Sequence, residues 1–143
     1  MDDPTTDRSY YRHVVDEQVR FSDTDALGHV NNVAVAALVE SGRVAFAMDL
    51  LTHAGARETS DAVAGLVLVR LEIDFRAELR YPAKLTVASR LVALGRTSLT
   101  VATGVFEGRR CAATARGVLV VVGTDGPRPI PADVRAALEQ ELP

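Results

Sequence analysis

The seven residues Val33-Ala-Val-Ala-Ala-Leu-Val39 are apolar on nearly every side of a helix. They begin a run that lacks proline, is rich in alanine and leucine and reaches about Leu51, and Asn31 and Asn32 stand before it as candidate caps. A helix that is apolar all round is buried on most of its sides. We therefore expect one long helix from Val33 to about Leu51, with a sheet wrapped around it.

Five segments around this helix have the pattern of β-strands. Apolar and polar residues alternate in them, and Gly95 and the pair Glu107-Gly108 supply turns between later ones. One segment precedes the helix and four follow it: Val15–Phe21, Val69–Phe75, Leu85–Leu94, Ser98–Phe106 and Arg110–Val122. This order predicts an α+β fold in which one curved antiparallel sheet surrounds the helix. Unpaired edge strands favour a homo-oligomer, either a homodimer or a homotetramer.

The length of the chain, 143 residues, predicts a single domain that spans residues 1–143. The polar residues 1–11 lack the features of a signal peptide, and we expect them to form a loose tail. Residues 53–61 are expected to form a loop. Three prolines open the stretch 127–143, which is expected to be a peripheral C-terminal segment with a short helix from Ala132 to Leu142.

Charge and composition exclude several classes of partner. The net charge is -3, from 16 basic and 19 acidic residues, and there is no long basic run to hold nucleic acid or an anionic membrane. The sequence also lacks the roughly 18 uncharged apolar residues of a membrane-spanning helix. The single cysteine, Cys111, cannot form an internal disulfide, and its apolar neighbours favour a packed thiol. These features predict a cytoplasmic protein that acts on small molecules.

The segment between Asp23 and Asn32 concentrates the polar groups that can perform chemistry. Two carboxylates, an imidazole, two amides and Gly28 lie directly before the N-terminus of the predicted helix. A helix start presents unpaired N–H groups and a positive dipole end, which can hold an oxyanion while a carbonyl is attacked. Gly28 would let a substrate approach the backbone. The segment is therefore the candidate active site.

Five motifs occur in order along the chain: Val19-Arg-Phe-Ser-Asp-Thr-Asp-Ala-Leu-Gly-His-Val-Asn-Asn32, Glu40-Ser-Gly-Arg43, Ile73-Asp-Phe75, Tyr81-Pro82 and Gly95-Arg-Thr-Ser98. Together they resemble the motifs of the 4-hydroxybenzoyl-CoA-thioesterase-like family of hotdog-fold proteins. The resemblance extends from about residue 13 to 135, and its most specific part lies at the start. The resemblance implies a hotdog fold and hydrolysis of an acyl thioester carried by coenzyme A or by acyl carrier protein.

The resemblance also implies roles for individual residues. The second aspartate of the motif, which matches Asp25, either attacks the thioester carbonyl or activates water, and Asp23 is not assigned the chemistry. The alternative for Asp25 is a carboxylate that caps the loop or helix. His29 either polarises the carbonyl and orients water or bonds the loop backbone. Asn31 and Asn32 are expected to cap the helix or brace the loop rather than to take part directly in oxyanion or substrate positioning.

Other polar residues are weaker candidates. Glu40 and Arg43 are three apart on the helix and are expected to form an ion pair, although some hotdog thioesterases place a catalytic glutamate on this helix, so Glu40 is a possible secondary acid. Arg96, Thr97 and Ser98 follow Gly95 where related proteins often place groups near the phosphates of coenzyme A. The alternative for these three residues is a solvated turn.

The helix departs from the family pattern, and the acyl group and two alternative functions stay open. Relatives usually have aromatic residues where this helix has Val35 and Leu38, so the acyl group cannot be carried over from the family. His13, His29 and His53 do not have metal-ligand spacing, and we expect neither a metal nor a cofactor other than coenzyme A as part of the substrate. The alternatives to a thioesterase are an enoyl-thioester hydratase or dehydratase and a non-catalytic acyl-CoA-binding module.

Overall fold

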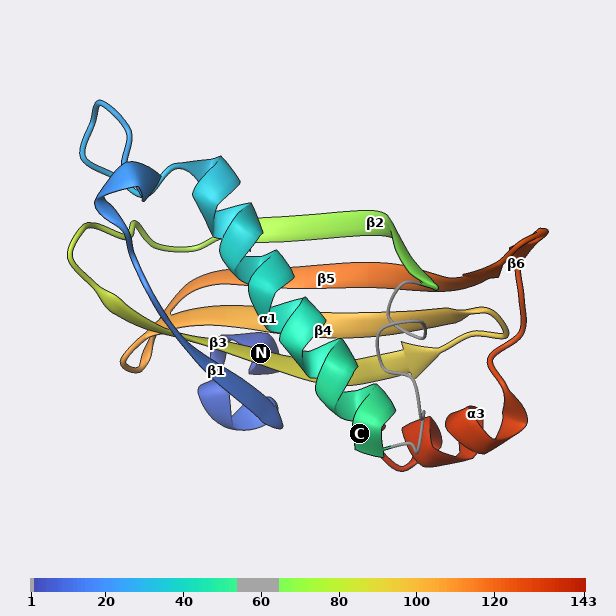
Figure 1. The fold of residues 1–143 in the computed structure, drawn as a ribbon. Helices are drawn as coiled ribbons and strands as arrows, with labels where there is room; N and C mark the ends of the chain where they lie inside the picture. The colour runs from blue at the N-terminus through green and yellow to red at the C-terminus, as the bar shows by residue number, and fades with distance from the viewer. Residues whose placement is uncertain (1, 54–64) are drawn as a thin grey trace.

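The computed structural model describes residues 2–53 and 65–143. One antiparallel sheet curls around one long helix, as the sequence predicted (Figure 1). The sheet order is β1-β3-β4-β5-β2, and β6 pairs with β5. In chain order the elements are the 3-10 helices η1 (Pro4–Thr6) and η2 (Arg8–Tyr10), β1 (His13–Gln18), η3 (Phe21–Asp23), α1 (Asn32–His53), β2 (Leu66–Phe75), β3 (Lys84–Leu94), β4 (Ser98–Glu107), β5 (Arg110–Gly123), β6 (Gly126–Pro127) and α3 (Ala132–Glu139).

Helix α1 lies across the concave face of the sheet and contacts β3, β4 and β1 (Figure 1). Its sheet-facing side chains are buried, among them Val35, Leu38 and Val39 in one core cluster and Phe46 and Leu50 in a second. Burial of these side chains against the sheet stabilises the position of α1.

Glycine 42 allows α1 to approach the sheet closely. A Cβ at Gly42 would lie 2.2 Å from Cγ1 of Val87 on β3, well inside van der Waals contact. The opposite side of α1 remains uncovered in one copy of the chain, because Val33 is 79% exposed and Met48 is 46% exposed. The expectation of a helix buried on most sides is therefore met only on the face toward the sheet.

The ends of several elements differ from the sequence-based boundaries. Strand β1 stops at Gln18, and Phe21, which was assigned to that strand, begins η3 with an exposed ring. Strand β2 begins three residues before Val69, at Leu66. Helix α1 extends to His53, and the rest of the predicted loop up to residue 61 lies outside the described residues.

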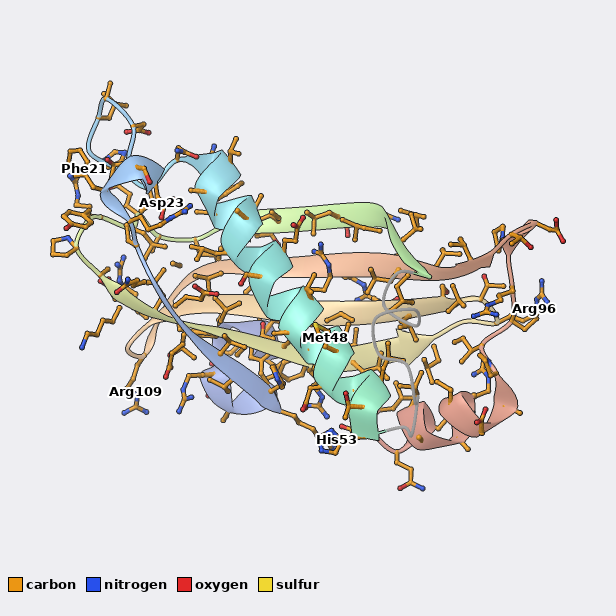
Figure 2. The ribbon with its side chains drawn as sticks, in the orientation of Figure 1. Phe21, Asp23, Met48, His53, Arg96 and Arg109 are labelled. Carbon is orange, nitrogen blue, oxygen red and sulfur yellow. The ribbon has the colours of Figure 1, made fainter. Side chains whose placement is uncertain are left out.

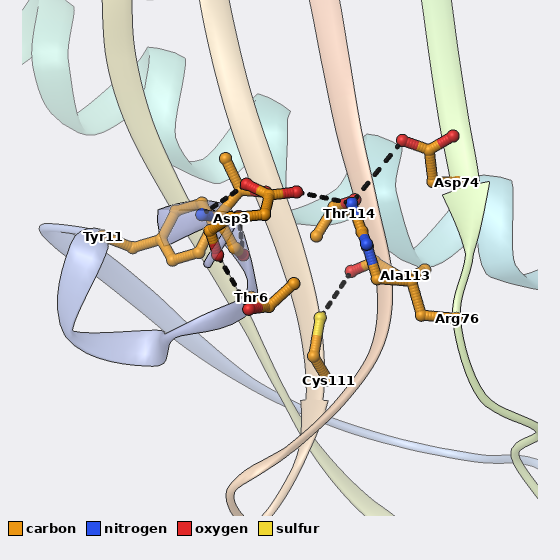
Figure 3. Close-up of polar contacts among 9 residues, drawn as sticks. Asp3, Thr6, Tyr11, Asp74, Arg76, Cys111, Ala113 and Thr114 are labelled. Carbon is orange, nitrogen blue, oxygen red and sulfur yellow. Dashed lines mark hydrogen bonds and ion pairs between the residues drawn. The ribbon is translucent and has the colours of Figure 1, made fainter. Parts of the chain in front are cut away.

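The N-terminal segment is ordered against the outer face of the sheet, so the prediction of a loose tail over residues 1–11 was wrong for residues 2–11. Asp3 caps η1 by accepting a hydrogen bond from the Thr5 N–H at 3.0 Å, and it pairs with Arg76 at 2.7 Å (Figure 3). The Tyr11 ring is 6% exposed and packs edge-on against Phe106. The sequence does not predict this anchoring of the N-terminal segment, because local polar turns and a single buried aromatic residue leave no periodic pattern.

Beside this anchor, Cys111 lies half-buried between β4 and the N-terminal segment (Figure 3). Its thiol donates to the carbonyl of Ala113 at 3.6 Å, and burial raises the pKa of the thiol. A raised pKa disfavours the nucleophilic thiolate. The geometry is that of the packed thiol expected from the sequence.

The C-terminal segment contributes to the core, which corrects the expectation that residues 127–143 are peripheral. Ile130 and Leu138, the latter only 1% exposed, belong to the cluster that also contains Phe46 and Leu50. Helix α3 therefore closes one end of the space between α1 and the sheet (Figure 1). In the described parts of the chain, no helix is both long and apolar enough to cross a membrane.

Candidate active site

The polar loop lies between η3 and the N-terminus of α1, at one end of the molecule (Figure 2). Asp23 is buried at its base. One carboxylate oxygen, Oδ2, accepts from the backbone N–H of Arg20 at 2.8 Å, and Oδ1 accepts from Nη2 of the same arginine at 2.9 Å. Burial raises the pKa of Asp23, but these hydrogen bonds and the charge of Arg20 outweigh burial and lower it overall. Asp23 is therefore an ionised brace with both oxygens in use.

Asn31 connects this brace to the helix. Its N–H and its Nδ2 both donate to the carbonyl of Asp23, at 2.9 and 3.0 Å, and its Oδ1 accepts from the Ala34 N–H at 2.7 Å. Asn31 is thus the N-cap of α1, which begins at Asn32. The side chain of Asn32 is exposed and makes no hydrogen bond to the described residues.

The cap leaves two backbone donors free at the start of α1. The N–H of Ala34 is bonded to the cap side chain, and the N–H of Val35 donates to the Asn31 carbonyl at 3.1 Å. The N–H groups of Asn32 and Val33 have no acceptor among residues 2–53 and 65–143. Both residues are exposed. These two N–H groups are the donors that the helix start offers to an oxyanion.

Asp25 lies in the exposed part of the loop, in a tight turn closed by its own backbone. Its N–H donates to the His29 carbonyl at 2.8 Å, and its Oδ1 accepts from the N–H groups of Leu27 and His29 at 2.9 and 3.2 Å. Gly28 permits the turn because its φ of 81° is in the left-handed region. The second oxygen of Asp25, Oδ2, makes no hydrogen bond within the described chain. One oxygen orients the carboxylate and the other is available for chemistry.

The imidazole of His29 contacts two residues that sequence analysis did not select. Nε2 of the ring lies 2.9 Å from Nη2 of Arg80 and 3.3 Å from Oε2 of Glu78. Both partners come from the connection between β2 and β3, about fifty positions away in the sequence. No spacing rule joins them to the loop. The sequence signal nearest to them is the motif Tyr81-Pro82, which Arg80 directly precedes.

A surface groove opens beside the loop. It has a volume of about 530 Å³ and runs between the end of β1 and the start of β3. The rings of Phe21 and Tyr81 meet edge to face there, 5.7 Å apart, and both are exposed. The cationic side chains of Arg20 and Lys84 also line it. The groove therefore combines aromatic surface and positive charge on the segment that leads into the polar loop.

The predicted phosphate-binding residues are not part of this site in a single copy of the chain. Arg96 and Thr97 lie in the turn between β3 and β4, and Ser98 begins β4. Arg96 and Asp23 lie at opposite ends of the molecule (Figure 2). Strand β3 alone has 11 residues, a length of roughly 35 Å. The backbone of this turn is used structurally, because the Arg96 carbonyl accepts from the Ile130 N–H at 3.0 Å. The exposed side chain of Arg96 fits the alternative of a solvated turn, and binding of the coenzyme A phosphates by these three residues stays a prediction.

Glu40 and Arg43 form the expected pair on α1, with Oε2 and Nη2 3.9 Å apart. Glu40 is exposed, whereas Arg43 is buried, and burial lowers the pKa of its guanidinium. Gly117 on β5 leaves room for the arginine, since a Cβ there would lie 3.4 Å from its Cδ. Val35 and Leu38, where relatives have aromatic residues, pack into the core rather than lining an open pocket. The absence of rings here is thus accommodated by core packing.

Comparison with known proteins identifies the family. The sequence profile of the Thioesterase-like superfamily matches residues 19–138. A thioesterase from Thermus thermophilus, solved with coenzyme A and zinc, is 29% identical over 90% of this chain and 98% of its own, with a TM-score of 0.79. A predicted thioesterase from Bacillus stearothermophilus is also 29% identical, over 90% and 95%, with a TM-score of 0.78. A thioesterase-superfamily protein from Jannaschia is 26% identical over 92% and 83%, with a TM-score of 0.77.

None of the curated proteins matches the sequence. The match to the superfamily covers most of the chain, and the solved thioesterases share its curled sheet and central helix. The chain belongs to the Thioesterase-like superfamily, and its fold is the hotdog fold. It is a thioester hydrolase.

Proposed function

We propose that this enzyme hydrolyses the thioester bond of an acyl-CoA at the loop between Asp23 and Asn32, with Asp25 as the group that acts on the thioester. The observation that carries the proposal is the asymmetry of the two aspartates. Asp23 uses both carboxylate oxygens to hold Arg20, whereas Asp25 is oriented through Oδ1 and its Oδ2 makes no hydrogen bond to the described residues.

In the general-base route, Oδ2 of Asp25 takes a proton from water while the water oxygen bonds to the thioester carbonyl carbon. The carbonyl oxygen becomes an oxyanion, which the free N–H groups of Asn32 and Val33 stabilise. Collapse of this intermediate breaks the carbon–sulfur bond, and the departing thiolate takes the proton from Asp25. In the covalent route, Oδ2 attacks the carbonyl carbon, the thiolate leaves, and water hydrolyses the resulting anhydride. Both routes use the same atoms of the chain.

Two observations support coenzyme A as the carrier of the acyl group: a similar protein solved with coenzyme A and the chemistry of a surface groove in this chain. The Thermus thermophilus thioesterase, 29% identical to this chain, was solved with coenzyme A. In this chain, the groove lined by Arg20, Phe21, Tyr81 and Lys84 adjoins the loop and offers stacking surface and positive charge to an anionic nucleotide. A cytoplasmic location and independence from any cofactor stay predictions from the sequence.

Thiol release from a panel of acyl-CoA substrates tests the proposal. Asp25→Asn keeps Oδ1 as an acceptor for the turn but removes the basic oxygen, so kcat should fall about 100-fold or more while the melting temperature is unchanged. Asp16→Asn, on the exposed side of β1, is the matched control and should be fully active. An Asp25→Asn enzyme as active as the parent would overturn the assignment. Loss of enoyl absorbance without thiol release would instead identify a hydratase.

We also propose that the enzyme is a homodimer joined through β2 and the uncovered face of α1. Strand β2 pairs only with β5 within the described chain, which leaves one edge of the sheet open. On α1, Val44 and Met48 are exposed one turn apart. Sedimentation should give twice the chain mass of 15.3 kDa. The double variant Val44→Asp with Met48→Asp should shift the enzyme to monomer, and a monomeric parent would refute the proposal.

A further inference from the structure

The Nε2 atom of His29 has two charged neighbours of opposite sign. Arg80 places Nη2 at 2.9 Å from it, and Glu78 places Oε2 at 3.3 Å. The same Nη2 atom of Arg80 also lies 3.5 Å from Oε2 of Glu78. The ring itself is largely covered, with 29% of the side chain exposed, while those of its two partners are exposed by 61% and 63%. The three side chains thus meet around a single ring nitrogen.

These contacts place opposite demands on the proton of Nε2. A guanidinium only donates, so a contact of 2.9 Å to Arg80 requires a lone pair on Nε2. A carboxylate only accepts, so a hydrogen bond to Glu78 would require a proton there. If Nε2 carried a proton, two donors would face each other at the shorter of the two distances. The shorter contact, to Arg80, therefore favours a lone pair on Nε2 and the ring proton on Nδ1.

Glu78 has a different role in this arrangement. Nη2 of Arg80 carries two hydrogens, and the geometry directs one to Nε2 of His29 and the other toward Glu78. The Glu78 carbonyl is in turn held by Nη1 of Arg110 at 2.8 Å. The carboxylate of Glu78 therefore holds the guanidinium of Arg80 next to Nε2 of His29. Arg110, from the hairpin between β4 and β5, holds the backbone of the β2–β3 connection at Glu78.

The other ring nitrogen of His29, Nδ1, has no partner in the described part of the chain. Nδ1 makes no hydrogen bond to the residues that the structure describes, and it is not among the buried unpaired atoms, so it is open to solvent or substrate. The backbone N–H of His29 is bonded to Oδ1 of Asp25 at 3.2 Å, which keeps the two catalytic candidates together. A neutral imidazole with Nδ1–H offers a hydrogen bond donor and has no free basic nitrogen.

We infer that Arg80, held by Glu78, is a positioning residue that keeps His29 neutral with its proton on Nδ1, so that His29 donates to the thioester carbonyl and does not act as the base. Asp25 is then the only residue of the loop that can take a proton or attack the carbonyl. The contact between His29 and substrate rests on the proposed function, whereas the proton position does not.

Nitrogen chemical shifts of histidine rings test the inference on the full-length enzyme. In protein labelled with 15N-histidine at about pH 8, above the ordinary titration of histidine, His29 should show an unprotonated Nε2. In Arg80→Met, protonated Nε2 should become populated, and kcat should fall about 10-fold with KM nearly unchanged. Arg80→Lys keeps a donor and should restore both the ring signal and most of kcat.

Arg110→Met is the matched control, because it removes a contact with the same connection without touching the ring. It should leave the His29 ring signal unchanged. A parent enzyme with the proton on Nε2 overturns the inference whether or not it hydrolyses acyl-CoA. Equal losses of kcat in Arg110→Met and Arg80→Met, with the ring signal unaltered in both, would reduce Arg80 to a structural role. Full activity of Asp25→Asn contradicts the proposed function alone and leaves the ring measurement to decide the proton position.

Discussion

The backbone carbonyl of Asp23 accepts two hydrogen bonds from Asn31, one from the N–H at 2.9 Å and one from Nδ2 at 3.0 Å. This double contact joins the two ends of the polar loop. It brings the end of η3 against the start of α1. The residues between them, Asp25 among them, are thereby confined to a closed turn.

Removing the cap should therefore cost both stability and activity. Asn31→Ala loses the bond to the Ala34 N–H and one of the two bonds to Asp23, and we expect unfolding to become easier by about 2 kcal/mol. Denaturant unfolding measures the change. Asn32→Ala is the matched control, because that side chain is exposed and unbonded, and it should cost less than about 0.5 kcal/mol. Equal costs for the two variants would show that Asn31 does not act as the cap.

The conformation of Gly28 gives a second prediction. Gly28→Ala forces a Cβ into a backbone with φ of 81°, 3.4 Å from Nη1 of Arg80, and should cost about 1 kcal/mol and lower kcat by disturbing the turn that holds Asp25. Gly108→Ala has a φ of 60° in the hairpin between β4 and β5 with open space around it. It should lose similar stability and keep its kcat. Loss of activity in both variants would mean that stability, not the loop, limits catalysis.

Acid should destabilise the fold in part through Asp23. The pKa of this carboxyl is lowered in the folded chain from its ordinary 3.8, so the folded state binds the proton less readily than the unfolded state. Its contribution to stability is complete above about pH 5 and is lost as the pH falls through 3.8 toward the lowered folded value. Melting temperatures measured from pH 6 to pH 3 should fall less steeply for Asp23→Asn than for the parent. Parallel curves would contradict this assignment.

The N-terminal segment should contribute measurably to stability. The Tyr11 side chain is buried against Phe106, and its hydroxyl donates to the Thr5 carbonyl at 2.8 Å. Tyr11→Ala should cost about 3 kcal/mol, in the range measured for large aromatic side chains removed from cores. Tyr81→Ala, which removes a ring that is 50% exposed, should cost much less. A small effect at Tyr11 would indicate that residues 2–11 are only loosely attached in solution.

Local patterns predicted most of the elements because their signals are periodic. The long proline-free apolar run from Val33 indicates a helix, the alternation along β2 has the period of a strand, and the turns at Gly95 and Gly108 fall where the strands end. The predictions for the two terminal segments were wrong for one physical reason. Their anchoring depends on a few isolated side chains, Tyr11 at one end and Ile130 and Leu138 at the other, and the partners that bury them come from distant parts of the chain.

The sequence by itself determined the fold class and the location of the polar loop before the helix, because both follow from the order of residues along the chain. The choice of Asp25 over Asp23 rests on the family resemblance and stays a prediction. The tertiary structure alone decided which oxygens and which N–H groups remain free, and it brought Glu78 and Arg80 to His29. The physical reason is that hydrogen bonds across the chain depend on distances set by sheet curvature and packing. Those distances also separate Arg96 from the loop by the full length of the sheet (Figure 2).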